Sequence, residues 1–397
     1  MSKVIAHIDL NAFFVTAEEI RNPSLINKPV AIGHEGRGGI VSTCSYTARK
    51  YGVSSGMPMF QAKQKCPNLI IVPVDFRYYK SLSAQFYDFM KRQTNLVEMV
   101  SIDECFVDFT EVIKNIKNPI DYFKKLQNDL LITTGLKCSI GIAPTKFLAK
   151  MASDYKKPMG ITIIRRNDIE KIIYPLPIED MFGIGKKTTP ILRQKEINTI
   201  GDLANKIINN DNDINNILGK NKVTLETWLK GYGSDTINLD TFNPKSIGRT
   251  KTLTFNTDNF DIIKKYLSEM AEEISKDAIK EKKYGTTIQV IIKEDNFVTH
   301  SKSVTLEKPF NKSDILYNEA TKIYQKHFLN YSIRLVGITL QNLQDYKTST
   351  IQMSLFENEE FEPENETKLL INDLNRKISK PILIRASELK EKKNGNN

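Results

Sequence analysis

The hydrophobic pattern along this chain divides it into three stretches, and this division constrains the fold more than any other feature of the sequence. Residues 1–165 alternate short apolar runs with amphipathic segments, a pattern typical of a mixed α/β unit. Residues 166–230 carry helical patterns, and residues 245–345 return to strands and helices. Because a chain of 397 residues is too long for one ordinary core, these stretches predict separate domains.

The first stretch predicts a sheet with acidic residues at the ends of its strands. A strand-like run leads into Asp9, and a predicted hairpin carries Asp103 and Glu104 in its turn. Strands that alternate with helices favour an antiparallel or mixed sheet with helices on one face. The strands expected here are residues 4–8, 97–101, 105–109 and 138–142, and the helices are residues 12–21, 77–95, 119–134 and 145–155.

The later stretches carry their own signals. In the helical stretch, the turn Gly183-Ile184-Gly185 separates two predicted helices. The last stretch begins after a linker that contains Gly231, Gly233 and Pro244. Its expected strands are residues 286–293 and 333–341, and its expected helices are residues 260–280 and 311–329.

Composition argues against several classes of protein. No run of 18 or more apolar residues is present, which argues against a membrane span. Residues 1–10 resemble a strand rather than a signal peptide, so we expect a cytoplasmic protein with no membrane partner. The four cysteines form no C-x-x-C pair and the four histidines no H-x-x-x-H pair, which argues against disulfides and zinc. The net charge of +10 suits a nucleic-acid partner, but it equally suits a surface charged for solubility.

Three carboxylates have the chemistry that phosphoryl transfer requires. Two Mg²⁺ ions can activate a hydroxyl nucleophile and neutralise the charge of the transferred phosphate, and Mg²⁺ prefers carboxylate oxygens. Asp9 at a strand end, and Asp103 and Glu104 in a hairpin turn, could supply them if the strands are neighbours. The spacing does not show that they meet, and an Asp-Glu pair in a turn usually faces solvent. Chemistry alone therefore leaves both interpretations open.

Several ordered blocks of sequence are more specific than any single motif. Taken together they resemble the Y-family DNA polymerases and, within them, the bacterial DNA polymerase IV branch, over about residues 3–345. The blocks are HIDLNAFF at 7–14, VSTCSYTARKYGV at 41–53, SIDECF at 101–106, CSIGIA at 138–143, KPMGI at 157–161, FGIGKKT at 182–188 and KSIGR at 245–249.

This resemblance implies an α/β multidomain enzyme shaped as a right hand. It implies a low-fidelity, template-directed DNA polymerase for translesion synthesis, which adds dNTPs to a primer 3′ end by two-metal phosphoryl transfer and has no proofreading exonuclease. The implied parts are a ferredoxin-like palm at 1–10 and 76–165, small fingers at 11–75, a helical thumb with a helix-hairpin-helix at 166–230, a linker at 231–244, an α/β little finger at 245–345 and a flexible tail at 346–397.

The resemblance also implies a role for each matched residue. Asp9, Asp103 and Glu104 would be catalytic and, with the backbone carbonyl of Leu10, would hold two Mg²⁺ ions. The position of Asn11 is acidic in many members of the family, so its part is open. Phe14 would be the steric gate that excludes a 2′-hydroxyl. The residues implied to bind the incoming dNTP are Phe14, Thr43, Tyr46, Arg49 and Lys157, and those implied to bind primer–template DNA are Gly183, Gly185, Lys186, Ser246, Arg249 and Lys251.

The tail carries one further signal. The pentapeptide Gln352-Met353-Ser354-Leu355-Phe356 matches the peptide with which bacterial proteins bind the sliding clamp, the β subunit, through Gln352, Leu355 and Phe356. Residues 357–366 follow with six glutamates and one proline, a composition that predicts a disordered spacer. We therefore expect a monomeric polymerase with the clamp as a partner.

Three other functions stay open on the sequence. A deoxycytidyl transferase of the same family would insert a single kind of nucleotide. A nucleotide cyclase presents similar paired carboxylates, and a DNA-binding scaffold would keep the fold without the chemistry. Primer extension with and without magnesium distinguishes all of these from a polymerase.

Overall fold

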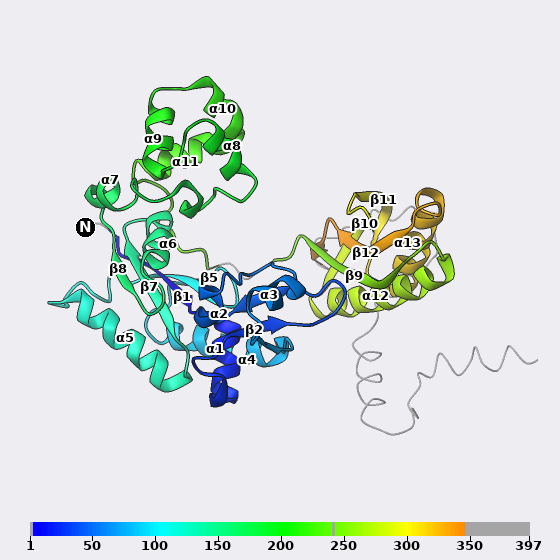
Figure 1. The fold of residues 1–397 in the computed structure, drawn as a ribbon, viewed down its shortest axis with the longest axis horizontal. Helices are drawn as coiled ribbons and strands as arrows, with labels where there is room; N and C mark the ends of the chain where they lie inside the picture. The colour runs from blue at the N-terminus through cyan, green and yellow to red at the C-terminus, as the bar shows by residue number, and fades with distance from the viewer. Residues whose placement is uncertain (1–2, 240–242, 346–397) are drawn as a thin grey trace, which may run out of the picture.

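The computed structural model describes residues 3–239 and 243–345 (Figure 1). Within these ranges the strands form three sheets. Two of the sheets come first in the chain, a helical region follows them, and the third sheet comes last. Four cores of buried apolar side chains accompany them. The strands and helices thus follow the three stretches that the hydrophobic pattern distinguishes along the chain.

The central sheet has five strands in the order β5-β6-β1-β7-β8. Strand β1 lies in the middle, antiparallel to β6 and β7, while β7 and β8 are parallel, so the predicted mixed sheet is confirmed. The predicted hairpin is the antiparallel pair β5 and β6. The strands are β1 (Ile5–Leu10), β5 (Val97–Met99), β6 (Glu104–Asp108), β7 (Cys138–Ala143) and β8 (Ile161–Ile163), of which β8 was not predicted.

Helices cover both faces of this sheet, so the expectation of helices on one face is wrong (Figure 1). Ala6, Ile8 and Leu10 of β1 belong to the core formed with α4 (Phe76–Lys91) and α5 (Pro119–Thr134). The alternate residue His7 contacts Ser153 of α6 (Lys146–Tyr155) on the other face. The expectation was wrong because the side chains of a strand alternate between its two faces. The second face of β1 carries polar residues, so hydrophobicity alone does not indicate that a helix covers it.

The backbone of helix α6 lies directly against β7 at Gly141. A Cβ placed on Gly141 would lie 2.1 Å from the carbonyl oxygen of Ala149 and 2.2 Å from the backbone nitrogen of Ser153. Backbone therefore packs on backbone at this point.

A second, small sheet follows α1 (Phe13–Arg21) and has the strand order β3-β2-β4. Ser45 connects its parts: its hydroxyl accepts hydrogen bonds from the backbone nitrogens of Val30 and Ala48, the latter capping α2. The elements are β2 (Val30–Gly33), β3 (Val41–Cys44), α2 (Tyr46–Lys50), α3 (Met59–Lys65) and β4 (Ile70–Val72).

The stretch from 166 to 230 is helical, as predicted, and its core continues into α6. Phe147 of α6 stacks on Trp228 at a centroid distance of 4.8 Å, which joins the two regions. Gly183 has a φ of 95°, a left-handed conformation that glycine adopts readily. The helices are α7 (Ile169–Ile172), α8 (Thr188–Gln194), α9 (Ile200–Ile208), α10 (Asn212–Leu218) and α11 (Lys222–Leu229).

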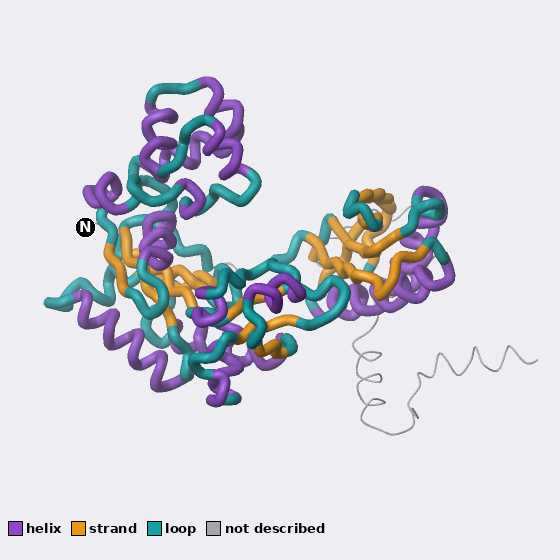
Figure 2. The backbone as a smooth tube through the Cα atoms, viewed as in Figure 1, coloured by secondary structure: helices purple, strands orange, loops and turns teal. Residues whose placement is uncertain are grey.

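The last unit is an antiparallel sheet with two helices packed against it (Figure 2). Its strand order is β11-β10-β12-β9, with the short β13 (Gln344–Asp345) paired to β10. The long strands are β9 (Ser246–Thr257), β10 (Lys283–Glu294), β11 (Thr299–Phe310) and β12 (Ile333–Gln341), and the helices are α12 (Phe260–Lys280) and α13 (Ser313–His327). Strands β9 and β11 were not predicted because, as largely exposed edge strands, they carry little apolar alternation.

The cysteine side chains and the helix lengths bear on the classes of protein that composition argues against. All four cysteines fall within the described residues, where they are buried and free. Among the helices of residues 3–239 and 243–345, none combines the length and apolar character that a membrane crossing requires.

The packing of α6 on β7 generates a stability prediction. Gly141→Ala forces a methyl group into the α6 backbone and should destabilise the protein by about 1–3 kcal/mol, the usual cost of overpacking. Gly185→Ala is the matched control, because a Cβ there has no heavy atom within 4 Å. Thermal unfolding measures both variants. A Gly141→Ala midpoint equal to that of the control would show that α6 is free to move away from the sheet.

Candidate active site

The pairing of β1 with β6 brings the predicted acidic residues together. In this register Asp9 lies directly opposite Glu104, and the backbone nitrogen of Leu10 donates to the carbonyl oxygen of Asp103 at 2.8 Å. A nitrogen of His7 and carboxylate oxygens of Asp9 and Glu104 all lie within 4.8 Å of one another. Residues separated by more than ninety positions thus share one end of two neighbouring strands.

Asp103 lies beside this group in the hairpin turn. Its carboxylate accepts a hydrogen bond from the Ser101 hydroxyl. Burial raises the pKa of Asp103, and the negative charges of Asp9 and Glu104 raise it further. A cation nearby would favour the ionised form of this carboxylate.

Two lysines neutralise the carboxylates. Nζ of Lys150, on α6, lies 3.2 Å from Oδ2 of Asp9 and 2.8 Å from Oε2 of Glu104. Nζ of Lys157, just after α6, lies 2.7 Å from Oδ1 of Asp9. Both lysines also contact Asp154, at 3.6 Å for Lys150 and 2.6 Å for Lys157. The site is therefore a compact network of positively and negatively charged side chains rather than an isolated acidic cluster.

His7 is a buried residue that contacts Glu104. Its side chain is 1% exposed, its Nδ1 lies 2.8 Å from the Ser153 hydroxyl and its Nε2 lies 3.2 Å from Oε2 of Glu104. Nε2 of His7 forms no hydrogen bond within the part of the chain that the structure describes, so its contact with Glu104 is one of proximity. Burial lowers the pKa of His7, so the ring is neutral near pH 7. Contact with His7 and Lys150 holds the pKa of Glu104 down to about 2, so this carboxylate is ionised.

The donor set fits a hard divalent cation. Carboxylate oxygens of Asp9 and Glu104 converge, whereas Asp103, which precedes Glu104 in the chain, is not among the described residues whose donor atoms converge there. Mg²⁺ is usually held by one or two such carboxylates together with phosphate oxygens and water. Divalent metal binding is thus within the chemistry of these residues.

Among the residues predicted to bind the nucleotide, Tyr46 interacts electrostatically with Asp9, Asp154 and Lys157 of this network. The guanidinium of Arg49 lies 4.6 Å from the ring centre of Tyr46, and its Nε donates to the carbonyl oxygen of Cys44 at 3.3 Å. Burial raises the pKa of Tyr46, while the charges of Arg49 and Lys157 act against that rise. The Tyr46 hydroxyl thus lies within the field of both cations. Thr43 is half-buried on β3, three residues earlier.

Phe14 and its neighbour Phe13 differ in burial. Phe13 is 3% exposed and belongs to the core of the central sheet. Phe14 is only half-buried and stacks on Tyr79 of α4, with ring centres 4.4 Å apart and planes 13° from parallel. Phe76 packs edge-on against it at 5.9 Å. The Phe14 ring thus packs against the rings of Tyr79 and Phe76.

Asn11 has a structural role. Its side chain is buried, and its Oδ1 accepts from the backbone nitrogen of Met159 at 2.7 Å. Its amide donates to the Ser139 hydroxyl at 2.9 Å. Asn11 thus joins the end of β1 to the segment that carries Lys157, and its donors and acceptors are used inside the protein.

The residues predicted to bind DNA lie away from the carboxylates. Gly183, Gly185 and Lys186 are in the helical region, whereas Ser246, Arg249 and Lys251 are on β9. Arg249 pairs with Glu273 at 2.9 Å and with Asp277, and Lys251 pairs with Glu269 at 3.4 Å, all on α12. The predicted clamp-binding residues Gln352, Leu355 and Phe356 lie outside the described residues.

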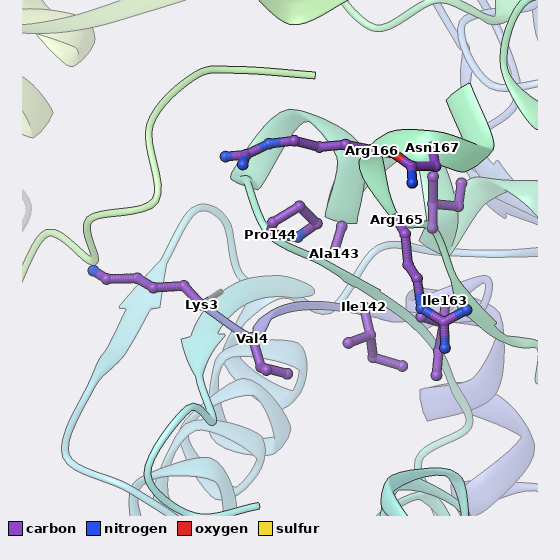
Figure 3. Close-up of a pocket in the computed structure, with 10 residues that line it drawn as sticks. Lys3, Val4, Ile142, Ala143, Pro144, Ile163, Arg165, Arg166 and Asn167 are labelled. Atoms are coloured by element: carbon purple, nitrogen blue, oxygen red, sulfur yellow. The ribbon is translucent and has the colours of Figure 1, made fainter. Parts of the chain in front are cut away.

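A cavity of about 340 Å³ elsewhere on the central sheet shares no residue with this site (Figure 3). It is lined by apolar side chains such as Val4 and Ile142, with Lys3, Arg165 and Arg166 around it. None of the predicted site residues is among those that line it.

Sequence reasoning missed four residues of the network, namely His7, Lys150, Ser153 and Asp154. The signal for two of them was present, since Lys150 and Asp154 are four residues apart on a predicted helix and therefore share a face. What the sequence lacked was the face of the sheet on which that helix packs.

Comparison with known protein families covers most of the chain. Residues 8–154 match the impB/mucB/samB family, residues 166–197 match the IMS family HHH motif, and residues 244–355 match the impB/mucB/samB family C-terminal domain. The three matches follow the division into central and small sheets, helical region and last sheet.

The similar proteins and solved structures are DNA polymerases. The chain is 35% identical over 385 residues to a DNA polymerase IV of Oceanobacillus iheyensis, covering 96% of this chain and 91% of that protein. It is 33% identical over 393 residues to a DNA polymerase IV 1 of Bacillus subtilis, covering 98% of this chain and 94% of that protein.

Two solved structures are similar at 27% sequence identity, and each match covers 86% of this chain and 99% of the other chain. A Y-family DNA polymerase chimera of Dbh and Dpo4 has a TM-score of 0.77. An insertion ternary complex of Dbh DNA polymerase has a TM-score of 0.59.

Proposed function

This chain belongs to the impB/mucB/samB family, in the DNA polymerase IV branch of the Y-family polymerases, and we propose that it holds its catalytic metal ions with Asp9, Asp103 and Glu104. It is a DNA-directed DNA polymerase of the translesion kind, and it uses divalent metal. The single observation that supports the ligand assignment is the β1–β6 register, which sets Asp9 opposite Glu104.

The metal would be two Mg²⁺ ions, with the backbone carbonyl of Leu10 as a further ligand. When bound, such ions activate the primer 3′-hydroxyl and neutralise charge on the transferred phosphate. The chain's own contribution is geometry: antiparallel pairing holds Asp9 and Glu104 at one strand end, and His7 contacts Glu104 from the buried side. A fixed set of ligands costs little reorganisation during the reaction.

The incoming dNTP would be bound by residues of β3, of α2 and of the segment that follows α6. Arg49 supplies a forked donor and Lys157 a point charge, and the hydroxyls of Thr43 and Tyr46 add hydrogen bonds. Lys157 contacts Asp9 at 2.7 Å, so it lies close enough to reach a phosphate held by the same metal ions. Phe14, held by Tyr79, would exclude the 2′-hydroxyl of a ribonucleotide.

DNA would be held by the other units. We assign the palm to 1–10 and 76–165, the fingers to 11–75, the thumb to 166–230 and the little finger to 245–345, joined by the linker 231–244. Gly183, Gly185 and Lys186 would contact phosphates from the thumb, and Ser246, Arg249 and Lys251 from the little finger. Arg249 and Lys251 would then exchange their α12 carboxylates for DNA phosphates.

The tail completes the proposal. Gln352, Leu355 and Phe356 would bind the sliding clamp, the β subunit, from residues 346–397. A tethered weak contact converts DNA binding into an intramolecular event and raises occupancy without new contacts at the active site. We further propose that the enzyme acts as a monomer in the cytoplasm.

The metal ligands are tested by substitution. Asp103→Ala or Glu104→Ala should lower the rate of nucleotide insertion by more than the roughly 10–100-fold typical of residues that only support a ligand. Binding of primer–template DNA should stay near that of the parent. Asp88→Ala, an exposed carboxylate on α4, is the control and should keep full activity. Primer extension with each dNTP in turn measures the rates and also distinguishes a polymerase from a deoxycytidyl transferase. Normal extension by either ligand variant would contradict the assignment.

The steric gate is tested by Phe14→Ala. Removal of the ring opens space beneath the sugar, so ribonucleotides should be inserted far more readily while dNTP insertion continues. The measurement is the ratio of dNTP to rNTP insertion efficiency. Phe60→Ala removes an exposed ring of the same kind from α3 and should leave this ratio unchanged. Equal ratios for Phe14→Ala and the parent would place the gate elsewhere.

The clamp peptide is tested by the double variant Leu355→Ala and Phe356→Ala. Extension by the free enzyme should equal that of the parent, because the active site is untouched. Stimulation by a clamp loaded on DNA should be lost. Phe361→Ala, in the glutamate-rich segment of the same tail, is the control and should retain stimulation. Full stimulation of the double variant would rule out residues 352–356 as the clamp contact.

A further inference from the structure

Lys150 occupies the centre of the carboxylate network. Its ammonium lies 2.8 Å from Oε2 of Glu104 and 3.2 Å from Oδ2 of Asp9, and its side chain is 17% exposed. Asp9 and Glu104 are also the two carboxylates whose oxygens converge with His7 as a possible metal site. A lysine ammonium and a divalent cation therefore have the same two carboxylates as partners.

A second acceptor for this ammonium is already in place. Oδ2 of Asp154, one turn further along α6, lies 3.6 Å from Nζ of Lys150. Oδ1 of the same carboxylate lies 2.6 Å from Nζ of Lys157. Asp154 is 46% exposed, so it can follow a lysine as the lysine moves without leaving a charge buried. Each lysine is thus shared between the metal-ligating carboxylates and one carboxylate outside them.

The charge of Lys150 makes it a competitor of a metal ion for Asp9 and Glu104. Burial acts to lower the pKa of Lys150, but the charges of Asp9, Asp154 and Glu104 outweigh it and raise the pKa, so the ammonium stays charged. A charged ammonium satisfies Asp9 and Glu104 while no other cation is near. A divalent cation at the same oxygens would be repelled at short range by that ammonium unless it moves away.

We propose that Lys150 and Asp154 set the affinity of the active site for divalent metal, with Lys150 competing for Asp9 and Glu104 and Asp154 receiving its ammonium when the metal binds. Both are positioning residues, since they act through the ligands. The inference rests on the proposed role of Asp9 and Glu104 as ligands. The two residues have opposite effects: Lys150 weakens metal binding, and Asp154 strengthens it.

A structural brace is the alternative role for Lys150. An ion pair from α6 to β1 and β6 could simply hold the helix on the sheet, and its loss would then lower stability whatever the metal concentration. Competition predicts something different. Loss of Lys150 would leave Asp9 and Glu104 to repel each other without metal, and metal would restore what was lost.

The experiment is a titration of the full-length protein with Mn²⁺ alone, followed by calorimetry. Mn²⁺ is a suitable probe because it takes the same oxygen ligands as Mg²⁺. Lys150→Met should bind Mn²⁺ roughly tenfold more tightly than the parent, within the usual range of coupling between two sites. Asp154→Asn should bind it more weakly. Lys156→Met, an exposed lysine at the end of the same helix, should match the parent. Unchanged or weaker binding by Lys150→Met overturns the proposal.

Thermal unfolding gives a second readout. In a chelator, Lys150→Met should unfold at a lower temperature than the parent, and saturating Mn²⁺ should raise its midpoint by more than it raises the parent's. A midpoint lowered equally with and without Mn²⁺ shows a brace and overturns the proposal. Glu104→Gln separates this from the proposed function. Parent binding that persists in Glu104→Gln contradicts the ligand assignment itself, whereas binding that is lost there but unchanged in Lys150→Met contradicts the competition alone.

Discussion

Repulsion between carboxylates at the end of β1 and β6 is the constraint around which the central sheet is arranged. Two unit charges about 4 Å apart interact by roughly 4 kcal/mol at an effective dielectric constant near 20. Antiparallel pairing holds Asp9 opposite Glu104 regardless of this repulsion, so the surrounding structure must supply cations. Lys150 and Lys157 do so from α6 and from the segment that follows it. The position of that helix therefore decides whether the site is stable.

Small side chains determine the position of α6. Gly141 lets the helix backbone lie directly on β7, and His7 and Ser153 contact each other at the same depth. Asn11 then ties the end of β1 to the segment that carries Lys157. Polar residues buried between a sheet and a helix are costly unless they are paired, and His7 contacts Ser153 while Asn11 bonds with Ser139 and with the backbone of Met159. Stability and chemistry therefore depend on the same contacts.

The expectation of helices on one face of the sheet was wrong for the same reason. Alternate positions of β1 and β7 carry His7, Asp9, Ser139 and Gly141, which read as a solvent-facing or irregular face when only hydrophobicity is considered. In the structure α6 covers that face. The edge strands β9 and β11 were missed because exposed strands need little apolar alternation, whereas the helix at 260–280 and the strand at 333–341 were predicted at their observed bounds because their apolar faces are strongly periodic.

The sequence by itself determined the order of the units, the ends of the strongly periodic elements and, through its ordered blocks, the acidic residues of the candidate site. These depend on local pattern, which each segment carries alone. Only the tertiary structure decided that Asp9 faces Glu104, that Asn11 is a structural residue, and that His7, Lys150 and Asp154 belong to the network. Such contacts join segments tens of residues apart, and they follow from strand register and helix packing, which no single segment specifies.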